Sequence, residues 1–300
     1  MRKLFTLVCF CTIFPLLTSY ASGQSQGEKN PAPTPAPTKN TQDFFGNALS
    51  DMDKAFNTSE PTLEDGYYLG RAVAANILAA YKPYTQNQEL TRYVNRICQT
   101  LVINSSQPAV FKGYYTIILD TPEYNAFASP GGHIFITRGL VEASISEDTL
   151  AAVIAHELAH IILQHGLSMI SDMSLSGEAA AMAQRAAELS NSPGAQRLMA
   201  FRNSVSGIID TMMKNGYSRT QEYAADREAA VILAASGYDP EALVEILRVL
   251  QRVQSSQYGG FNTTHPTPAE RITNVEGVAR QYKSRVQDTR SYRVPRFKNK

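Results

Sequence analysis

The pattern of apolar and polar positions changes period along the chain, from helical spacing to strand-like runs and back. Apolar side chains recur at helical spacing from Thr62 to Tyr84, and Pro83 closes this run. A second helical pattern follows from about Asn87 to Ile103. Cys98 lies next to the apolar stripe of this second helix, so we expect a buried and unreactive thiol.

The segment from Gly113 to Leu140 is rich in β-forming residues. Residues 114–119 predict one strand, and the Pro130-Gly131-Gly132 sequence divides residues 125–137 into two strand-like halves. Helices then resume. Ser144 and Glu147 have the spacing of a capping box, and the helix they begin is predicted to run to Gly166. Two more helices are predicted near residues 220–235 and 240–253. The pattern therefore predicts an α+β fold, mostly helical, with a small β-sheet lodged between helices.

The first 23 residues have the pattern of a secretory signal peptide. Basic residues precede an apolar run from Leu4 to Leu17, and cleavage is plausible after Ala21 or Gly23. An uncleaved anchor is the less favoured alternative, because the run is shorter than the roughly 20 residues of a membrane span. The proline-rich residues 24–42 predict a solvated arm. We therefore expect a periplasmic or cell-envelope protein, with outer-membrane association left open.

Composition excludes several classes of protein. A 300-residue chain with 43% apolar and 18% charged residues can bury a full core, so neither a disordered chain nor a disulfide-stapled miniprotein is expected. The net charge of +1 and the absence of a basic stripe in the central region argue against nucleic acid as a partner. With only five histidines, any cluster among them is informative.

Two further segments carry weaker signals. Residues 167–216 are rich in Ser, Ala and Met, which fits either helical packing or a mobile cover over a cleft. The chain from Arg280 to Lys300 has eight basic side chains against Asp288 alone, and residues 284–300 are expected to form a solvated basic tail.

The sequence His156-Glu157-Leu158-Ala159-His160 carries the strongest chemical signal. Residues four apart differ by only about 40° around a helix, so the two imidazoles project from one face as ligands of a single metal ion. Glu157 lies on the adjoining face, where it can reach a metal-bound water rather than the metal.

A catalytic zinc site needs a third protein ligand and an open position. His165 lies five residues after His160 and about 140° away around the axis, so we expect it beside a ligand or at the helix end. Glu222 is the better third ligand, with Asp226 one turn later to hold a histidine ring. The alternative to a role at the metal is that Glu222 and Asp226 simply lie on a solvent-exposed face of their helix, as paired carboxylates commonly do.

These motifs together resemble those of the zinc metallopeptidases that include HtpX, the OMA-type mitochondrial protease and the periplasmic proteases BepA and LoiP. The resemblance covers residues 60–283. It rests on four motifs in the family's order: Asn125-Ala126-Phe127-Ala128 with Pro130-Gly131-Gly132, His156-Glu157-Leu158-Ala159-His160, Ser218-Arg219-Thr220-Gln221-Glu222-Tyr223-Ala224-Ala225-Asp226, and His265-Pro266 followed by Arg271-Ile272. The expected fold is a zincin-like metalloprotease domain over residues 43–283.

The resemblance also implies roles for single residues. His156, His160 and Glu222 would bind one zinc ion per chain, and Glu157 would be the general base. Asp226 and Arg271 would support the ligands. His265 would approach the open side of the metal, where it either stabilises the oxyanion or blocks water in a latent form. Separately, an edge strand including Asn125, Ala126, Phe127 and Ala128 would bind the substrate backbone.

The expected function is cleavage of unfolded or misfolded envelope proteins. The alternative is a latent or non-catalytic zinc-binding chaperone or interaction module. The chain shows no spanning segment after residue 23 and ends soon after Arg271, so it looks closest to a stand-alone LoiP-like protease without C-terminal repeats. Substrate identity, cleavage specificity, peripheral membrane association and oligomeric state stay open.

Overall fold

The computed structural model describes residues 63–169, 216–253 and 265–298. All of them belong to one compact unit, Lys39–Lys300. The predicted signal peptide, the proline-rich arm and residues 170–215 of the predicted cover lie outside the described residues. Among the described helices, none combines the length and apolar character needed to cross a membrane.

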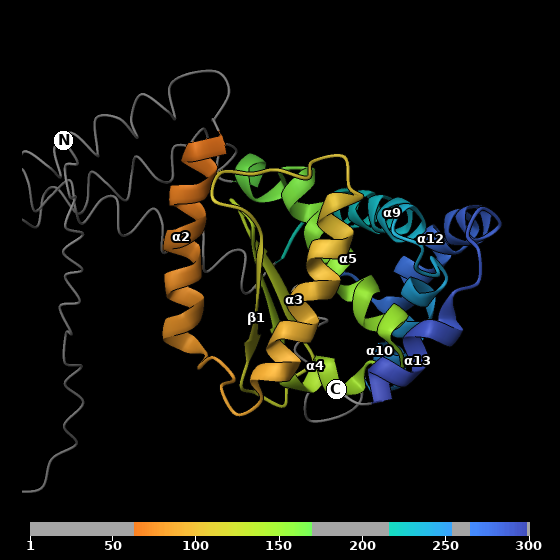
Figure 1. Cartoon of the computed structure of the whole chain (residues 1–300). Coiled ribbons are helices and arrows are strands. Elements are labelled where there is room, and N and C mark those ends of the chain that lie inside the picture. The colour runs from red at the N-terminus through yellow and green to blue at the C-terminus, as the bar shows by residue number, and fades with distance from the viewer. Residues whose placement is uncertain (1–62, 170–215, 254–264, 299–300) are drawn as a thin grey trace, which may run out of the picture. The chain divides into compact units, whose positions relative to one another are not determined.

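The described residues form helices around one small sheet, which confirms the predicted α+β class (Figure 1). The elements in chain order are α2 (Leu63–Ala80), α3 (Gln88–Ile103), β1 (Tyr115–Leu119), β2 (Ala126–Ser129), β3 (His133–Thr137), α4 (Arg138–Ala143), α5 (Glu147–Ile162), α9 (Arg219–Ala235), α10 (Ala242–Val253), α12 (Pro268–Lys283) and α13 (Arg290–Lys298). The predicted helices and strands before residue 140 and between 220 and 253 are all present.

The sheet has the order β1-β3-β2, with β1 parallel and β2 antiparallel to β3. The turn between β2 and β3 is formed by Pro130-Gly131-Gly132, as predicted. Gly131 and Gly132 have φ angles of 76° and 104°, which glycine adopts without steric cost. A Cβ atom on Gly131 would lie 2.4 Å from Tyr67 Cα, so this turn also needs glycine in order to meet α2. The order leaves β2 at an edge of the sheet.

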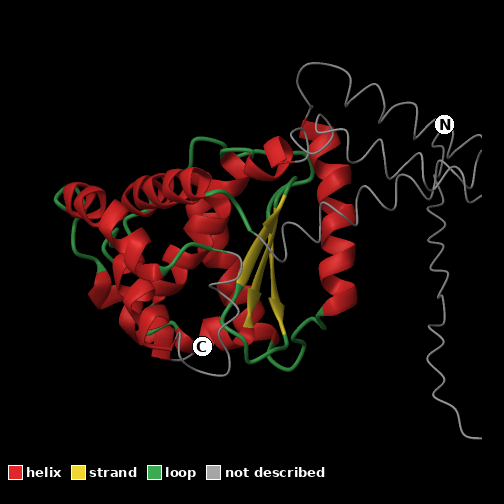
Figure 2. Ribbon diagram, turned by 180° about the vertical axis from the view of Figure 1, so that it is seen from behind, coloured by secondary structure: helices red, strands yellow, loops and turns green. Residues whose placement is uncertain are grey.

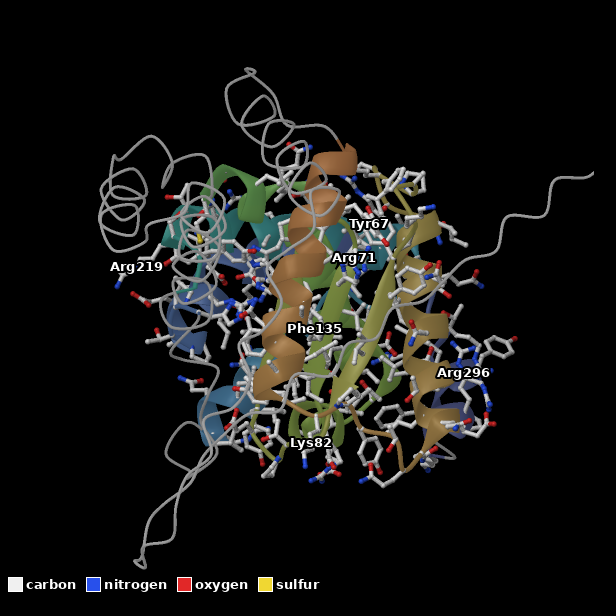
Figure 3. All side chains as sticks on the ribbon, turned by 90° about the vertical axis from the view of Figure 1, so that its left-hand side faces the viewer. Tyr67, Arg71, Lys82, Phe135, Arg219 and Arg296 are labelled. Atoms are coloured by element: carbon white, nitrogen blue, oxygen red, sulfur yellow. The ribbon has the colours of Figure 1, made fainter. Side chains whose placement is uncertain are left out.

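Helices lie on both sides of the sheet (Figure 2). Alternating side chains of the strands belong to two different apolar clusters, one on each face. Phe127 and Phe135 join Val73 and Ile77 of α2 in a small apolar cluster, and Figure 3 shows Phe135 on the sheet behind that helix. Residues such as Ile134 face the main core, which α3, α5, α9, α10 and α12 complete. Because α5 lies between the sheet and the other helices, its residues from Glu147 to Ile161 are all buried.

The predicted start of α5 is wrong by two residues. Ser146 is the N-cap, and it forms a capping box with Thr149 rather than with a glutamate. Ser144 instead ends α4, and its hydroxyl donates to Leu140 O at 3.0 Å. Glu147 is unavailable for capping because its carboxylate accepts a hydrogen bond from the Tyr93 hydroxyl at 2.7 Å.

The predicted end of α5 at Gly166 is also wrong. The helix ends at Ile162, and Gln164 adopts a φ of 55°, so the chain changes direction there. Residues 165–169 then form a further helical segment. This change of direction returns His165 toward α5 instead of carrying it around a continuous helix.

The expectation of a solvated tail over residues 284–300 is wrong at Arg293 of α13, whereas the other residues of this helix are exposed or half-buried. Arg293 on this helix is 6% exposed and donates to Asp148 on α5. Figure 1 shows α13 close to the start of α5, and residues of the two helices are in contact. The basic composition of the segment is matched by buried carboxylates on α5, so its charge serves packing as well as solvation.

Gly70 allows α2 to touch the β2–β3 turn. A Cβ atom at this position would lie 1.6 Å from Pro130 O. The added atom would force the backbone of α2 or of the β2–β3 turn to move. We therefore expect Gly70→Ala to lower the free energy of unfolding by about 1–3 kcal/mol, measured by urea denaturation. Gly277 on α12 is the matched control: a Cβ there meets nothing within 4 Å, so Gly277→Ala should stabilise the protein by up to about 1 kcal/mol. Equal effects of the two substitutions would contradict this account.

Candidate metal centre

Two neighbouring helices provide most of the polar groups of the site. The motif His156-Glu157-Leu158-Ala159-His160 lies in the last two turns of α5, which is buried on all sides. Glu222 lies in the first turn of α9, after a capping box formed by Ser218 and Gln221. Residues of α9 pack along α5, so Glu222 and Asp226 approach the two histidines from the facing helix.

Four buried side chains bring potential ligand atoms together. One atom from each of His156, His160, Glu222 and His265 can be chosen so that all lie within 4.8 Å of one another. The Nε2 atoms of His156 and His160 are 3.1 Å apart. The His156 nitrogen lies 3.4 Å from Glu222 Oε2, and the His160 nitrogen lies 3.5 Å from Glu222 Oε1.

These separations fit a tetrahedral zinc site. Zinc bonds of about 2.0–2.2 Å place neighbouring ligand atoms about 3.3–3.6 Å apart. The three distances among His156, His160 and Glu222 lie close to this range. Two ring nitrogens that face each other at 3.1 Å cannot both point a proton at the other, whereas a cation satisfies both lone pairs. The two-nitrogen, one-oxygen set is one that catalytic zinc uses.

His265 lies differently from the other three. Its Nδ1 is 2.9 Å from both carboxylate oxygens of Glu222, which is hydrogen-bonding distance. The residue precedes the N-cap Thr267 of α12, so the start of that helix carries the imidazole to the site. His265 thus contacts the predicted third ligand and closes one side of the group.

The electrostatics of the group favour a positive charge. Burial acts to raise the pKa of Glu222, but the neighbouring histidines outweigh it and hold the pKa well below its usual range. Burial and Arg271 act to lower the pKa of His156, but hydrogen bonds with Asp226 and Glu222 outweigh both and raise the pKa to about 9. Burial holds the pKa of His160 well below its usual value. An ionised Glu222 and a neutral His160 are the states that bind a metal cation, and a metal that binds Nε2 of His156 would displace the proton that this ring holds at neutral pH.

Asp226 and Arg271 orient His156. The Nδ1 of His156 lies 3.0 Å from Asp226 Oδ1, so its N–H can donate to this carboxylate and leave Nε2 free to bind a metal. Arg271, on α12, donates to both oxygens of Asp226, at 2.9 Å and 2.5 Å. The guanidinium holds the pKa of Asp226 below its usual value despite burial. The fork of Arg271 therefore keeps the carboxylate charged and fixed.

His165 and Tyr217 hold the second imidazole. The Nδ1 atoms of His165 and His160 are 2.9 Å apart, and burial lowers the pKa of His165 to about 4, so the neutral His165 ring can accept a hydrogen bond from the Nδ1–H of His160. The ring of Tyr217 stacks on His160 with centroids 4.1 Å apart and an angle of 17°. His165 thus contacts a predicted ligand, as the sequence indicated.

Glu157 is buried beside the group, with 1% of its surface exposed. Burial raises the pKa of its carboxyl, and the nearby histidines only partly oppose this effect. Among the described residues, no side chain or backbone group forms a hydrogen bond with its Oε1. A buried carboxylate oxygen without a protein partner is the arrangement expected for a group that binds water or substrate.

Comparison with known families identifies this arrangement. Residues 85–279, which include all of these site residues, match peptidase family M48. The chain belongs to peptidase family M48. Membership confirms the suspected family and the predicted enzyme class, a metal-dependent peptidase.

Curated relatives support the M48 assignment. The beta-barrel assembly-enhancing protease of Escherichia coli is 28% identical over 207 residues, which are 68% of this chain and 42% of that protein. The mitochondrial metalloendopeptidase OMA1 of Schizosaccharomyces pombe is 27% identical over 189 residues, 62% of this chain and 52% of that protein. The chain therefore spans less than two thirds of the length of these relatives.

The structure does not bring every predicted residue of this M48 domain to the metal group. The side chain of Phe127 packs with α2 on the opposite face of the sheet. The ring of His133 lies against Tyr67, at 6.0 Å between centroids, whereas the other four histidines form one cluster of ring contacts. Tyr217 was missed, although it directly precedes the predicted α9 motif and that position could have indicated it.

Asp226 provides a test of how the M48 ligands are held. Asp226→Asn keeps the shape of the side chain but removes the charge shared by His156 and Arg271. We expect zinc affinity to fall by about 10–100-fold, measured by competition with a chelator. Asp288→Asn removes a carboxylate whose side chain is 63% exposed and should leave the affinity unchanged. If Asp226→Asn binds zinc as tightly as the wild type does, the Asp226 carboxylate does not strengthen zinc binding by His156.

Proposed function

We propose that the chain is a zinc-dependent endopeptidase in which His156, His160 and Glu222 bind the metal and Glu157 is the general base. The observation that carries this proposal is the buried Glu157 carboxylate, with an oxygen lacking a described protein partner, beside a two-histidine, one-glutamate group of tetrahedral spacing. Membership of family M48 supports the same chemistry.

Zinc bound there would lower the pKa of a water molecule to about 7 and polarise the scissile carbonyl. Glu157 removes a proton from the attacking water and later delivers it to the leaving amine. The raised pKa of its carboxyl suits both steps, because a more basic carboxylate takes up the proton more readily and holds it until the leaving amine receives it. Asp226 keeps the His156 ring in one orientation throughout.

The substrate backbone would lie along the outer edge of β2. Thr137 N–H donates to Asn125 O at 3.0 Å, so by alternation the peptide groups of Ala126 and Ala128 point away from β3. Two of these backbone groups form hydrogen bonds with side chains. Asn125 Oδ1 accepts from Ala126 N–H at 2.9 Å, and the Tyr217 hydroxyl donates to Ala128 O at 3.4 Å. A substrate strand would replace both contacts. Binding through the main chain imposes little sequence preference.

Weak sequence preference suits substrates that are recognised because they are unfolded. We therefore propose misfolded or damaged cell-envelope proteins as the substrates and quality control as the physiological role. The predicted signal peptide supports a periplasmic or envelope location. The similarity to a protein named beta-barrel assembly-enhancing protease fits this setting.

Replacing the general base separates zinc binding from cleavage. In Glu157→Gln we expect zinc at near-normal stoichiometry and loss of casein cleavage, because the amide cannot take the proton from water. Metal analysis and a fluorescent casein assay measure the two properties. Glu89→Gln, at a side chain that is 75% exposed, is the matched control and should cleave normally. Cleavage by Glu157→Gln would remove this residue from the mechanism.

A second function, a latent or non-catalytic zinc-binding module, is favoured by the position of His265. Its Nδ1 contacts both oxygens of Glu222, and the residue is 8% exposed. An imidazole there covers one side of the group, where it would restrict the entry of water and substrate. The arrangement is that of a closed site, which could bind unfolded chains without cutting them.

Removing this imidazole distinguishes the two functions. We expect His265→Ala to increase the rate of casein cleavage several-fold, because the side chain no longer blocks the group. Addition of Glu157→Gln to this variant should abolish the gain. A fall in kcat instead would assign His265 to oxyanion stabilisation. No chelator-sensitive cleavage in either His265→Ala or the wild type would favour the non-catalytic module.

A further inference from the structure

A second buried charge cluster lies at the opposite end of the active-site helix from the metal group. Glu147 and Asp148 form the first turn of α5, and they are only 2% and 4% exposed. Carboxylates are favourable at a helix N-terminus, but burial of two of them requires further partners. The positively charged partners come from α13.

Arg293 forms the central contact of this cluster. Its Nε donates to Asp148 Oδ2 at 2.9 Å, and its Nη2 donates to Asp148 Oδ1 at 2.7 Å. Nη1 donates at 3.1 Å to the carbonyl oxygen of Gly237, which lies just after α9. The side chains of the ion pair are 8% and 6% exposed. A bidentate pair of this kind fixes both distance and orientation.

Glu147 forms the second contact. Arg296, also on α13, pairs with both of its carboxylate oxygens. The Tyr93 hydroxyl on α3 donates to the same carboxylate at 2.7 Å, and the Tyr238 hydroxyl donates at 3.0 Å. Arginine and tyrosine together hold the pKa of Glu147 below its usual value despite burial. The first turn of α5 is thus connected to α3, α13 and the segment before α10.

The middle of α5 offers no comparable fixed points. From Leu150 to Ala155 the helix is entirely apolar and rich in alanine. Contacts between apolar side chains are not directional, so they resist rotation or sliding of a helix less than hydrogen bonds do. Asp148 lies eight residues, about 12 Å, before His156 on the same uninterrupted helix. Its position is therefore transmitted to the metal-binding turns.

We propose that Arg293 and Arg296 are positioning residues that set the rotation and axial position of α5, and with them the placement of His156, Glu157 and His160. We call the two arginines with Glu147 and Asp148 the C-terminal clasp. The proposal rests on the proposed function only where catalysis is measured. Its metal-binding consequences are independent of cleavage.

The decisive experiment separates positioning from stability. Replacing a buried ion pair by apolar residues is often neutral or stabilising. The double variant Arg293→Met with Asp148→Leu should therefore fold, and its resistance to urea should fall only through loss of the hydrogen bond from Asp239 N–H to Asp148 Oδ1, which is 2.9 Å long in the wild type. Arg293→Lys keeps the charge but loses the bidentate fork. Arg290→Ala is the control, because Arg290 lies on the same helix in an exposed pair with Asp288.

Each protein is loaded with cobalt(II) in place of zinc, and its visible absorption reports the geometry of the ligands. We expect a shifted spectrum and about tenfold weaker zinc binding in the double variant and in Arg293→Lys, with both unchanged in Arg290→Ala. For cleavage we expect kcat to fall by about 10–100-fold with KM unchanged, because small displacements of catalytic groups are costly.

A wild-type spectrum and zinc affinity in both Arg293→Lys and the double variant overturn the clasp as a positioning device. If the double variant fails to fold, Arg293→Lys decides by the same two measurements. If the spectra shift but the wild type itself cleaves nothing, the proposed peptidase function fails while the clasp stands. Normal cleavage with a wild-type spectrum in a stable double variant would leave α13 a purely structural role.

Discussion

The approach of α9 to α5 is the contact on which the site depends. Glu222 and Asp226 can reach His156 only when the two helices lie close together, and the distance between packed helices depends on the side chains at their contact. Both helices bury small residues next to their site residues: Ala155, Ala159, Ala225 and Ala229. A branched or aromatic residue among them would increase the separation of the axes, and the spacing of about 3.3–3.6 Å between ligand atoms would be lost.

Bringing the helices together also brings charge into the core. Glu222 and Asp226 are both fully buried, and a buried carboxylate without a partner costs several kcal/mol. Arg271 offsets much of this cost, because its guanidinium is 1% exposed and contacts Asp226 directly. The arginine comes from α12, so the docking of that helix on α9 is an electrostatic requirement of the site as well as an apolar contact. The same docking places His265 against Glu222.

The parts of the site that could be predicted are those encoded by local spacing. His156 and His160 share a helix face whatever the rest of the chain does, and Glu222 with Asp226 follows the same rule. The details that failed depend on distant partners. Ser144 has the spacing of a cap for Glu147, but tertiary contacts with Tyr93, Tyr238 and Arg296 engage that carboxylate instead. The basic segment near Arg293 has the composition of a solvated tail, and its buried acceptor lies 145 residues earlier in the chain. The stacking of Tyr217 on His160 likewise joins two segments that lie far apart in the chain.

Complete burial of α5 gives Glu157 its distinct position. The helix carries five buried ionisable side chains: Glu147, Asp148, His156, Glu157 and His160. Each must find a partner in the core or raise the free energy of the fold. Among the described residues, arginines of α13 are partners for both carboxylates of the first turn. Asp226, Glu222 and His165 are partners for the two imidazoles. For Glu157 Oε1 they supply no hydrogen bond. The fold therefore keeps one acceptor unmatched beside the metal group, and a proton from water is what that oxygen can take.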